Sequence, residues 1–168
     1  IWTMSAATTA IDHRHAMYPT PAFESKICPP AALAERIRVL PRPLVFTNGC
    51  FDILHRGHVT YLAQARALGA AMVVALNSDD SVRRQGKGAD RPINALADRL
   101  AVMASLASVD LVTWFDEDTP IARILECTPD VLVKGGDWPP ERIVGAPETL
   151  ARGGSVHSIP FEHQRSTT

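Results

Sequence analysis

The sequence has no marked excess of charge of either sign. It contains 17 lysines and arginines against 18 aspartates and glutamates among 168 residues, which leaves a net charge of −1. General nucleic-acid binders usually have a clear basic excess, so this near-balance argues against a nucleic-acid partner. Lysine is the scarcest charged residue type, at 3 residues against 14 arginines, so a lysine in a loop is conspicuous.

Cysteines and long apolar runs are also few. The three cysteines, Cys28, Cys50 and Cys127, are far apart and form no CxxC pair, so we interpret them as reduced thiols. The longest strongly apolar run, residues 68–76, is much shorter than the roughly 20 residues that a transmembrane helix needs. Because the start of the sequence also does not resemble a signal peptide, these absences predict a cytoplasmic protein with no membrane partner.

Hydrophobic residues make up 46% of the chain and charged residues 21%, which is the composition of a globular protein of about one domain. We expect three parts. Residues 1–28 have no sustained periodicity and are expected to form a mobile N-terminal arm. Residues 29–42 form a helical extension, with a helix over residues 29–40 between flanking prolines. The main domain covers residues 43–168.

From residue 44 onward, short apolar runs alternate with helical stretches. The expected strands cover residues 44–47, 72–77, 111–114, 131–134 and 156–159. The expected helices cover residues 58–68, 78–84, 95–108, 120–127 and 147–152. The strands lack polar alternation, as is typical of strands covered on both faces. The pattern therefore predicts a three-layer α/β fold with a five-stranded parallel sheet and right-handed crossovers.

In such folds, ligands bind beyond the carboxyl ends of the strands. The loop after the first strand has no GxGxxG fingerprint, and Gly86-Lys87 lacks the surrounding residues of a Walker A motif. That first loop instead contains His55-x-Gly57-His58. Two imidazoles three residues apart at a helix start can point the same way, and the free backbone N–H groups and dipole there favour an anion. Gly57 would let a ribose or base lie against the backbone.

The stretch Thr47–Leu62 resembles the HxGH signature of the cytidylyltransferase-like nucleotidyltransferases. Four later motifs match in order: residues 75–79 (ALNSD), 83–88 (RRQGKG), 130–138 (DVLVKGGDW) and 166–168 (STT). The resemblance covers residues 43–168 and implies a Rossmann-like nucleotidyltransferase fold. It is strongest to the branch that transfers AMP from ATP to D-glycero-β-D-manno-heptose 1-phosphate. That reaction gives ADP-heptose and pyrophosphate for the inner core of lipopolysaccharide, and the absence of a sugar-kinase domain implies the stand-alone form.

The resemblance also implies roles for individual residues. The expected catalytic residues are His55, His58 and Lys87, which would neutralise charge on the α-phosphate and the leaving pyrophosphate. The expected nucleotide-binding residues are Asn48, Gly49, Cys50, Phe51, Gly57, Lys134, Gly135, Gly136, Ser166, Thr167 and Thr168. The expected acceptor-binding residues are Asp52, Asn77, Asp79, Asp137 and Trp138. Asp52 could instead hold the loop, and Asp79 could instead cap a helix.

The implied cofactor chemistry is simple. ATP is a substrate, and Mg²⁺ is expected to arrive with it, since no carboxylate cage is visible and no protein-held metal site is expected. The family resemblance implies a homo-oligomer, a dimer or larger. The last motif of the family continues into a helix with a basic residue, so we expect that helix either to be missing after Thr168 or to lie in a tail that orders when ATP binds. Asp98 and Arg99, within the expected helix 95–108, are interpreted as structural ion-pair residues.

Two alternatives stay open. The first is the same chemistry with another acceptor or nucleotide, as in glycerol-3-phosphate or ethanolamine-phosphate cytidylyltransferases or flavin adenylyltransferase; competition between ATP and CTP would discriminate it. The second is a nucleotide-binding regulator without catalysis, against which the intact His55, His58 and Lys87 count.

Overall fold

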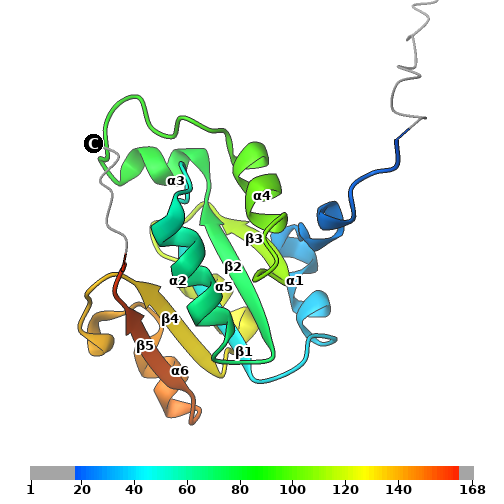
Figure 1. Cartoon of the computed structure of the whole chain (residues 1–168). Helices are drawn as coiled ribbons and strands as arrows, with labels where there is room; N and C mark the ends of the chain where they lie inside the picture. The colour runs from blue at the N-terminus through cyan, green and yellow to red at the C-terminus, as the bar shows by residue number, and fades with distance from the viewer. Residues whose placement is uncertain (1–17, 163–168) are drawn as a thin grey trace, which may run out of the picture.

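Five short apolar strands form one parallel sheet in the computed structural model, which describes residues 18–162 (Figure 1). The strands are β1 (Leu44–Gly49), β2 (Ala71–Asn77), β3 (Leu111–Phe115), β4 (Val131–Gly135) and β5 (Ser155–Ile159). Their order in the sheet is β3-β2-β1-β4-β5, and every neighbouring pair is parallel. All residues of β2 are buried, which explains why this strand shows no polar alternation. The predicted α/β class and parallel sheet are confirmed.

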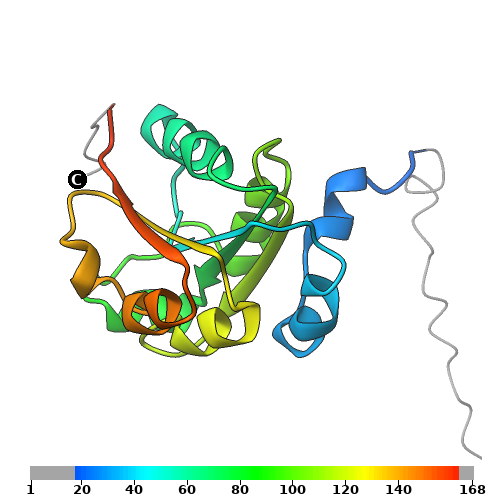
Figure 2. The same ribbon diagram turned by 90° about the horizontal axis from the view of Figure 1, so that it is seen from below.

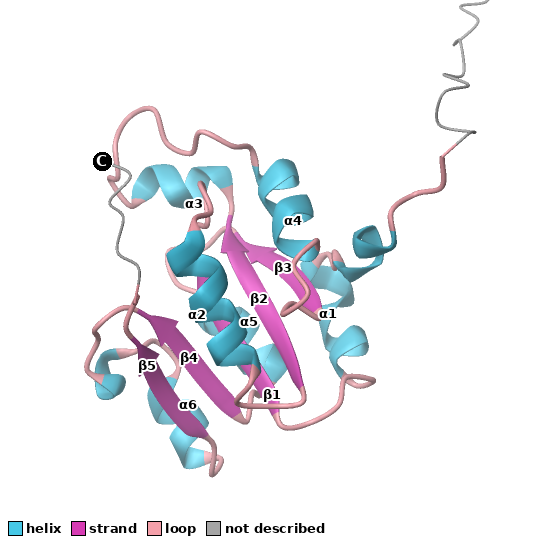
Figure 3. Ribbon diagram, viewed as in Figure 1, coloured by secondary structure: helices cyan, strands magenta, loops and turns pink. Residues whose placement is uncertain are grey.

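Helices cover both faces of the sheet (Figures 2 and 3). The described helices are η2 (Ala22–Lys26), α1 (Pro30–Ile37), α2 (Arg56–Arg66), α3 (Asp79–Arg84), α4 (Leu96–Ala104), α5 (Ile121–Cys127), η3 (Pro140–Arg142) and α6 (Ala146–Ala151), of which η2 and η3 are 3-10 helices. α2 and α4 bury their apolar residues in the core cluster on one face. α1, α5 and α6 contribute to the cluster on the other face. The chain therefore has the three layers that the alternating pattern predicts.

The N-terminal part of the described chain is packed against the domain. The Cys28 side chain is fully buried, and its backbone N–H donates to the Val112 carbonyl at 2.8 Å. Ile27 forms an isolated bridge with the same residue. Residues 22–28 therefore belong to the packed structure and not to the arm expected over residues 1–28, because η2 and Cys28 make apolar contacts that leave no periodicity in the sequence. Residues 1–17 and the predicted site residues Ser166–Thr168 lie outside the described residues.

Two arginine–aspartate pairs join the amino ends of the strands. Arg66 at the end of α2 contacts Asp110 at 2.8 Å and donates to the carbonyls of Gly69 and Ala70. Arg42 contacts Asp130 at 2.9 Å in the same way before β4. These contacts lie at the end of the sheet opposite the carboxyl ends of the strands. None of the helices in the described part of the chain has the length and apolar character that a membrane crossing needs.

The order of the strands indicates which edge of the sheet binds ligands. β1 lies beside both β2 and β4, so the chain leaves β1 in one direction and later returns to its other side at β4. Open α/β sheets bind ligands at such a switch point, beyond the carboxyl ends of the strands. The loops after β1 and β4 are those that carry the HxGH and KGGDW motifs.

Candidate active site

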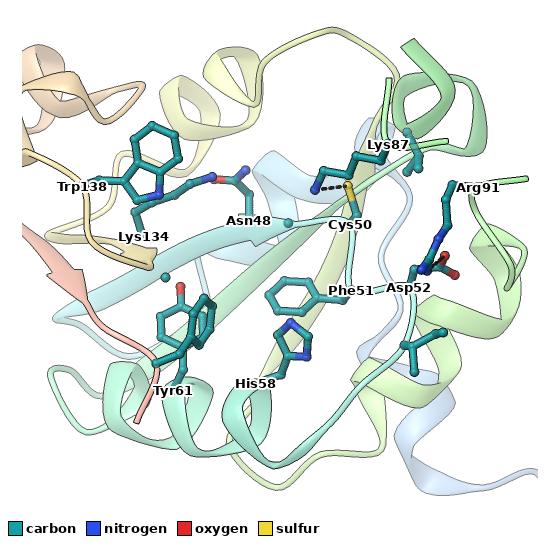
Figure 4. A pocket seen from close by; sticks show the side chains of 15 residues that line it. Asn48, Cys50, Phe51, Asp52, His58, Tyr61, Lys87, Arg91, Lys134 and Trp138 are labelled. Atoms are coloured by element: carbon teal, nitrogen blue, oxygen red, sulfur yellow. Dashed lines mark hydrogen bonds and ion pairs between the residues drawn. The ribbon is translucent and has the colours of Figure 1, made fainter. Parts of the chain in front are cut away.

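A cavity of about 600 Å³ opens beyond the carboxyl ends of β1 and β4 (Figure 4). It is lined by Asn48, Gly49, Cys50, Phe51, Asp52, Ile53, His58, Tyr61, Val82, Lys87, Arg91, Lys134, Gly135, Trp138 and Phe161. These residues come from five separate stretches of the chain, so only the folded sheet brings them together. Its size is that of a small-molecule site.

The histidine pair stands at the start of α2. His55 is the N-cap residue, and its Nδ1 accepts a hydrogen bond from the Gly57 backbone N–H at 3.0 Å. That bond leaves Nε2 of His55 as the nitrogen free to meet a ligand. The His55 and His58 rings lie 4.0 Å apart between centroids, with their planes inclined by 34°. The HxGH spacing therefore places both imidazoles together at the positive end of a helix dipole.

His58 is held between aromatic rings. It makes edge contacts with Phe51 and with Phe161, at centroid distances of 5.5 and 5.7 Å. Its Nδ1 is buried and has no hydrogen-bond partner among the described residues. Burial, aided by the positive charges of His55 and Lys87, lowers the pKa of His58 to about 4. The imidazole is therefore neutral at pH 7 in the free protein.

Lys87 reaches the cavity from the segment that follows α3. Its Nζ lies 3.9 Å from the Cys50 thiol (Figure 4). The Cys50 thiol also approaches Asn77 Oδ1 at 3.6 Å and Gln85 Oε1 at 3.5 Å. The neighbouring Gly86 has a φ of +68°, a conformation that glycine adopts without strain. Cys50 is thus the residue of the first loop that Lys87 contacts.

Lys134, at the end of β4, approaches the cavity from the other side (Figure 4). Its ammonium lies 5.9 Å from the Trp138 ring centroid. Burial lowers the pKa of Lys134, and the Lys87 ammonium lowers it further. Two of the chain's three lysines thus bring positive charge to one cavity. That arrangement favours an anionic ligand.

Glycine at the end of β4 keeps the cavity floor open. A Cβ atom on Gly135 would lie 2.9 Å from the Phe161 ring and 3.2 Å from Tyr61. Gly136 has a φ of +110°, and a Cβ there would lie 3.1 Å from Nε1 of Trp138. The Trp138 backbone N–H is fixed by Ser158 Oγ at 2.9 Å. The loop therefore holds its shape only with small residues at both positions.

Asp52 lines the cavity, but its carboxylate is engaged by the protein. It accepts hydrogen bonds from the backbone N–H groups of Ile93 and Asn94, each at 2.8 Å, and pairs with Arg91 at 3.0 Å. Burial on its own would raise the pKa of Asp52, but the donors of Asn94, Ile93 and Arg91 hold it below its ordinary value. The sequence allowed Asp52 either to hold the loop or to bind the acceptor. In the structure its carboxylate holds the loop.

Three expected acceptor residues do not line the cavity. Asn77 is buried at the end of β2, where its amide donates to Ser81 Oγ at 3.0 Å. Asp79 forms an ion pair with Arg99 at 2.7 Å, while the N-cap of α3 is Ser78. Asp137 is exposed beyond β4. His55, Gly57 and Gly136 stand directly beside the lining residues, and the remaining predicted residues in the described range line the cavity.

Several lining residues were not predicted from the sequence. Tyr61 follows His58 by one helical turn, and its hydroxyl bonds to Thr47 Oγ1 under the cavity floor. Phe161 stands two residues after β5, in a loop position where ligands of this fold class bind. Ile53, Val82 and Arg91 complete the wall. The spacing of Tyr61 and the position of Phe161 were signals in the sequence, whereas the other three had none.

Within residues 18–162, no group of three or more His, Cys, Asp or Glu side chains could hold a metal ion.

Comparisons with known proteins agree on the kind of domain. A family model described as cytidylyltransferase-like matches residues 46–145. The chain is 55% identical over 148 residues to the D-beta-D-heptose 1-phosphate adenylyltransferase of Bordetella bronchiseptica, covering 87% of this chain and 91% of that protein. It is 58% identical over 125 residues to the bifunctional protein HldE of Haemophilus ducreyi, covering 74% of this chain. The chain spans only 26% of that longer relative.

Solved structures show the same fold. The lipopolysaccharide core biosynthesis protein from Thermoplasma volcanium superposes with a TM-score of 0.58 at 29% identity, covering 73% of this chain and 98% of that one. The pantoate–β-alanine ligase of Francisella tularensis superposes with a TM-score of 0.54 at 14% identity, covering 84% of this chain and 68% of that one. The second similarity concerns the fold alone.

Proposed function

The chain belongs to the cytidylyltransferase-like family, and from that premise we propose that it transfers AMP from ATP to D-glycero-β-D-manno-heptose 1-phosphate. The products are ADP-heptose, for the inner core of lipopolysaccharide, and pyrophosphate. The observation that carries the proposal is the near full-length similarity to a heptose 1-phosphate adenylyltransferase, at 55% identity. The imidazole pair, of which His58 lines the cavity and His55 stands beside it, and the two lysines that line the cavity support the same chemistry.

The reaction is an in-line displacement at phosphorus. An oxygen of the acceptor's phosphate attacks the α-phosphorus of ATP, and the bond from that phosphorus to the oxygen bridging to the β-phosphorus breaks. Pyrophosphate leaves with that electron pair. A sugar phosphate has a second pKa near ~6 and is mostly a dianion at neutral pH, so the nucleophile needs no general base. The protein has to align the two phosphates and stabilise the charge that develops between them.

The two histidines are proposed to bind the α-phosphate. His55 has its Nδ1 occupied by the Gly57 N–H, so Nε2–H is the group that donates to a phosphate oxygen. His58 is neutral in the free protein and can likewise donate from one nitrogen. The first-turn backbone N–H groups of α2 add a positive end to the same place. Donors fixed before the substrate arrives cost no reorganisation during reaction.

The lysines and the glycine loop complete the proposed nucleotide site. Lys87 is proposed to neutralise the leaving pyrophosphate, and Lys134 a nearer phosphate, since they reach the cavity from opposite sides. Asn48, Gly49, Cys50 and Phe51 are proposed to meet the nucleotide through the loop backbone, and Gly57, Gly135 and Gly136 through close approach. Ser166, Thr167 and Thr168 stay proposed phosphate ligands by resemblance. On the acceptor side, Trp138 and Asp137 stay proposed contacts. Asp52, Asn77 and Asp79 are proposed to support the site through their bonds to neighbouring residues and not to touch the acceptor.

Further properties of the protein are proposed on the family resemblance. Mg²⁺ is proposed to enter with the phosphates of ATP, where it supplies charge neutralisation on the β- and γ-phosphates. The protein is proposed to act in the cytoplasm as a homo-oligomer, a dimer or larger, with the catalytic domain starting near residue 43. Sedimentation velocity of the purified chain measures the oligomeric state.

A nucleotide competition experiment tests the function. Purified protein is given heptose 1-phosphate with ATP or CTP, and pyrophosphate release is followed by a coupled assay. The proposal predicts turnover with ATP and little with CTP. Turnover only with CTP, or with glycerol 3-phosphate in place of the heptose phosphate, would assign the chain to another branch of the family. ATP binding without turnover would instead favour a regulator.

A further inference from the structure

Arg99 is a charged side chain with almost no access to solvent. It lies on α4 and is 2% exposed. Its Nη1 donates to the carbonyls of Cys50 at 2.9 Å and Asn77 at 2.8 Å, and its Nε donates to the carbonyl of Asn94 at 3.0 Å. Its Nη2 pairs with Asp79 at 2.7 Å. A buried guanidinium is stable only with such complete pairing.

The four acceptors belong to four different parts of the site. Cys50 is in the loop after β1, and Asn77 is the last residue of β2. Asp79 is the first residue of α3, and Asn94 lies near the end of the long segment between α3 and α4. One planar group therefore fixes how these parts stand relative to one another. The rigid fork of arginine suits such a task, because its donors cannot move independently.

The segment between α3 and α4 carries Lys87. Its exposed middle contains Gly86 at φ +68° and Gly88 at φ +119°, which leaves the backbone there free to adopt other conformations. Its far end is held at Asn94, whose N–H is bound by Asp52 and whose carbonyl is bound by Arg99. Arg99 also fixes the carbonyl of Cys50, the residue whose thiol lies 3.9 Å from Lys87 Nζ. Arg99 thus bonds both to the far end of the segment that carries Lys87 and to the loop residue that Lys87 contacts.

We propose that Arg99 is a positioning residue for the transfer reaction: it sets the place of the Lys87 ammonium relative to the His55–His58 pair without touching the substrate. The inference rests on the proposed function. It goes beyond the role of a structural ion pair that the sequence suggested, because a structural role would stabilise the fold without any link to Lys87.

A conservative pair of variants tests it. R99K keeps the charge but not the fork, so it cannot serve all four acceptors at once. R66K is the control, because Arg66 likewise joins one carboxylate to backbone carbonyls, two of them against three for Arg99, but lies at the opposite end of the sheet. Both variants are expected to lower the melting temperature. Only R99K is expected to lower kcat, by about 10-fold or more, since small misplacements are costly in transfer reactions.

A double-mutant cycle with K87A decides whether the effect passes through Lys87. Once Lys87 is removed, R99K is expected to cause little further loss of kcat. The effect of R66K on kcat is expected to be the same with and without Lys87. An equal R99K effect with and without Lys87 would overturn the proposal, as would equal kinetic losses in R99K and R66K. If R99K does not fold, D79N loosens the same guanidinium by removing its ion-pair partner, and the same cycle applies.

A binding measurement keeps this inference separate from the proposed function. Titration calorimetry with ATP needs no turnover. It gives the dissociation constant of ATP for the wild type, R99K, K87A and the double variant, which form the same double-mutant cycle. If the wild-type chain releases no pyrophosphate, the proposed function fails. The Arg99 proposal is then supported if R99K weakens ATP binding when Lys87 is present and not when it is absent. Any other result overturns it.

Discussion

His55 and His58 lie with their rings 4.0 Å apart at the first turn of α2, and the two side chains differ in how the protein holds them. His55 is fixed by a hydrogen bond from the Gly57 backbone, whereas His58 is fixed by contacts with Phe51 and Phe161. One imidazole thus has a defined free nitrogen, and the other is kept neutral by its surroundings. The pair offers hydrogen bonds rather than a proton-transfer relay.

Replacing His55 by asparagine should separate catalysis from helix capping. Asparagine is a good N-cap residue, so H55N should keep the stability of α2 while losing the imidazole. We expect kcat to fall by ~100-fold. H55A should show the same kinetic loss and, in addition, a free energy of unfolding lower by about 1 kcal/mol. Steady-state kinetics and urea unfolding of both variants check this. Wild-type turnover in H55N would remove His55 from the mechanism.

His58 should stay neutral far below its ordinary pKa. Burial and two positive neighbours disfavour the charged imidazolium, so the pKa falls to about 4. In an NMR titration of the free protein, the His58 ring signals should keep their neutral shifts as the pH is lowered to about 5. K87A should raise this pKa, because it removes one of the positive charges. Titration of His58 near pH 6.5 in the wild type would contradict the account.

The Cys50 thiol should report on ATP binding. Cys50 lines the cavity, whereas Cys28 and Cys127 are fully buried. Iodoacetamide should therefore label the native protein once, at Cys50, as read by peptide mass spectrometry. ATP should slow this labelling in proportion to the fraction of protein with nucleotide bound, because the nucleotide is proposed to lie against the Cys50 loop. Labelling unaffected by saturating ATP would place the nucleotide elsewhere.

Two glycines with positive φ allow a matched test of the β4 loop. G136A and G153A both force a side chain into a left-handed conformation, at φ +110° and +83°, so each should lose about 1 kcal/mol of stability. Only the Cβ at position 136 meets a site residue, at 3.1 Å from Trp138, while position 153 has open space around it. G136A alone should weaken substrate binding in titration calorimetry. Equal binding by the two variants would remove the Gly136 loop from the site.

The strands could be predicted because burial on both faces leaves a direct mark on the sequence. The run over β2, for example, is apolar from Ala71 to Leu76 and is buried throughout. The helix expected over residues 95–108 ends at Ala104 instead. After it, Ser105 bonds back to the Val102 carbonyl at 2.6 Å, a local contact that competes with helix continuation. Periodicity alone does not show such an ending.

The site could be predicted only where its residues follow one another in the chain. The HxGH and KGGDW stretches meet because both follow neighbouring parallel strands. The pairing of Asp79 with Arg99 could not be predicted from neighbouring residues in the chain. The sequence predicts Asp79 at the acceptor, but Arg99, twenty residues later, pairs with its carboxylate, which stays about one-third exposed. The carboxylate with which Arg99 pairs depends on how α4 packs against the sheet, and the spacing of residues in the sequence does not determine that packing.

The central claim is tested most directly by identifying the product of one reaction mixture. Purified protein is incubated with ATP labelled at the α-phosphorus, Mg²⁺ and D-glycero-β-D-manno-heptose 1-phosphate, and the products are separated by mass. The label is expected to appear in ADP-heptose, with one pyrophosphate released for each molecule formed, and H55N is expected to form it about 100-fold more slowly. No labelled sugar nucleotide from the wild-type protein, or formation at an equal rate by H55N, would contradict it.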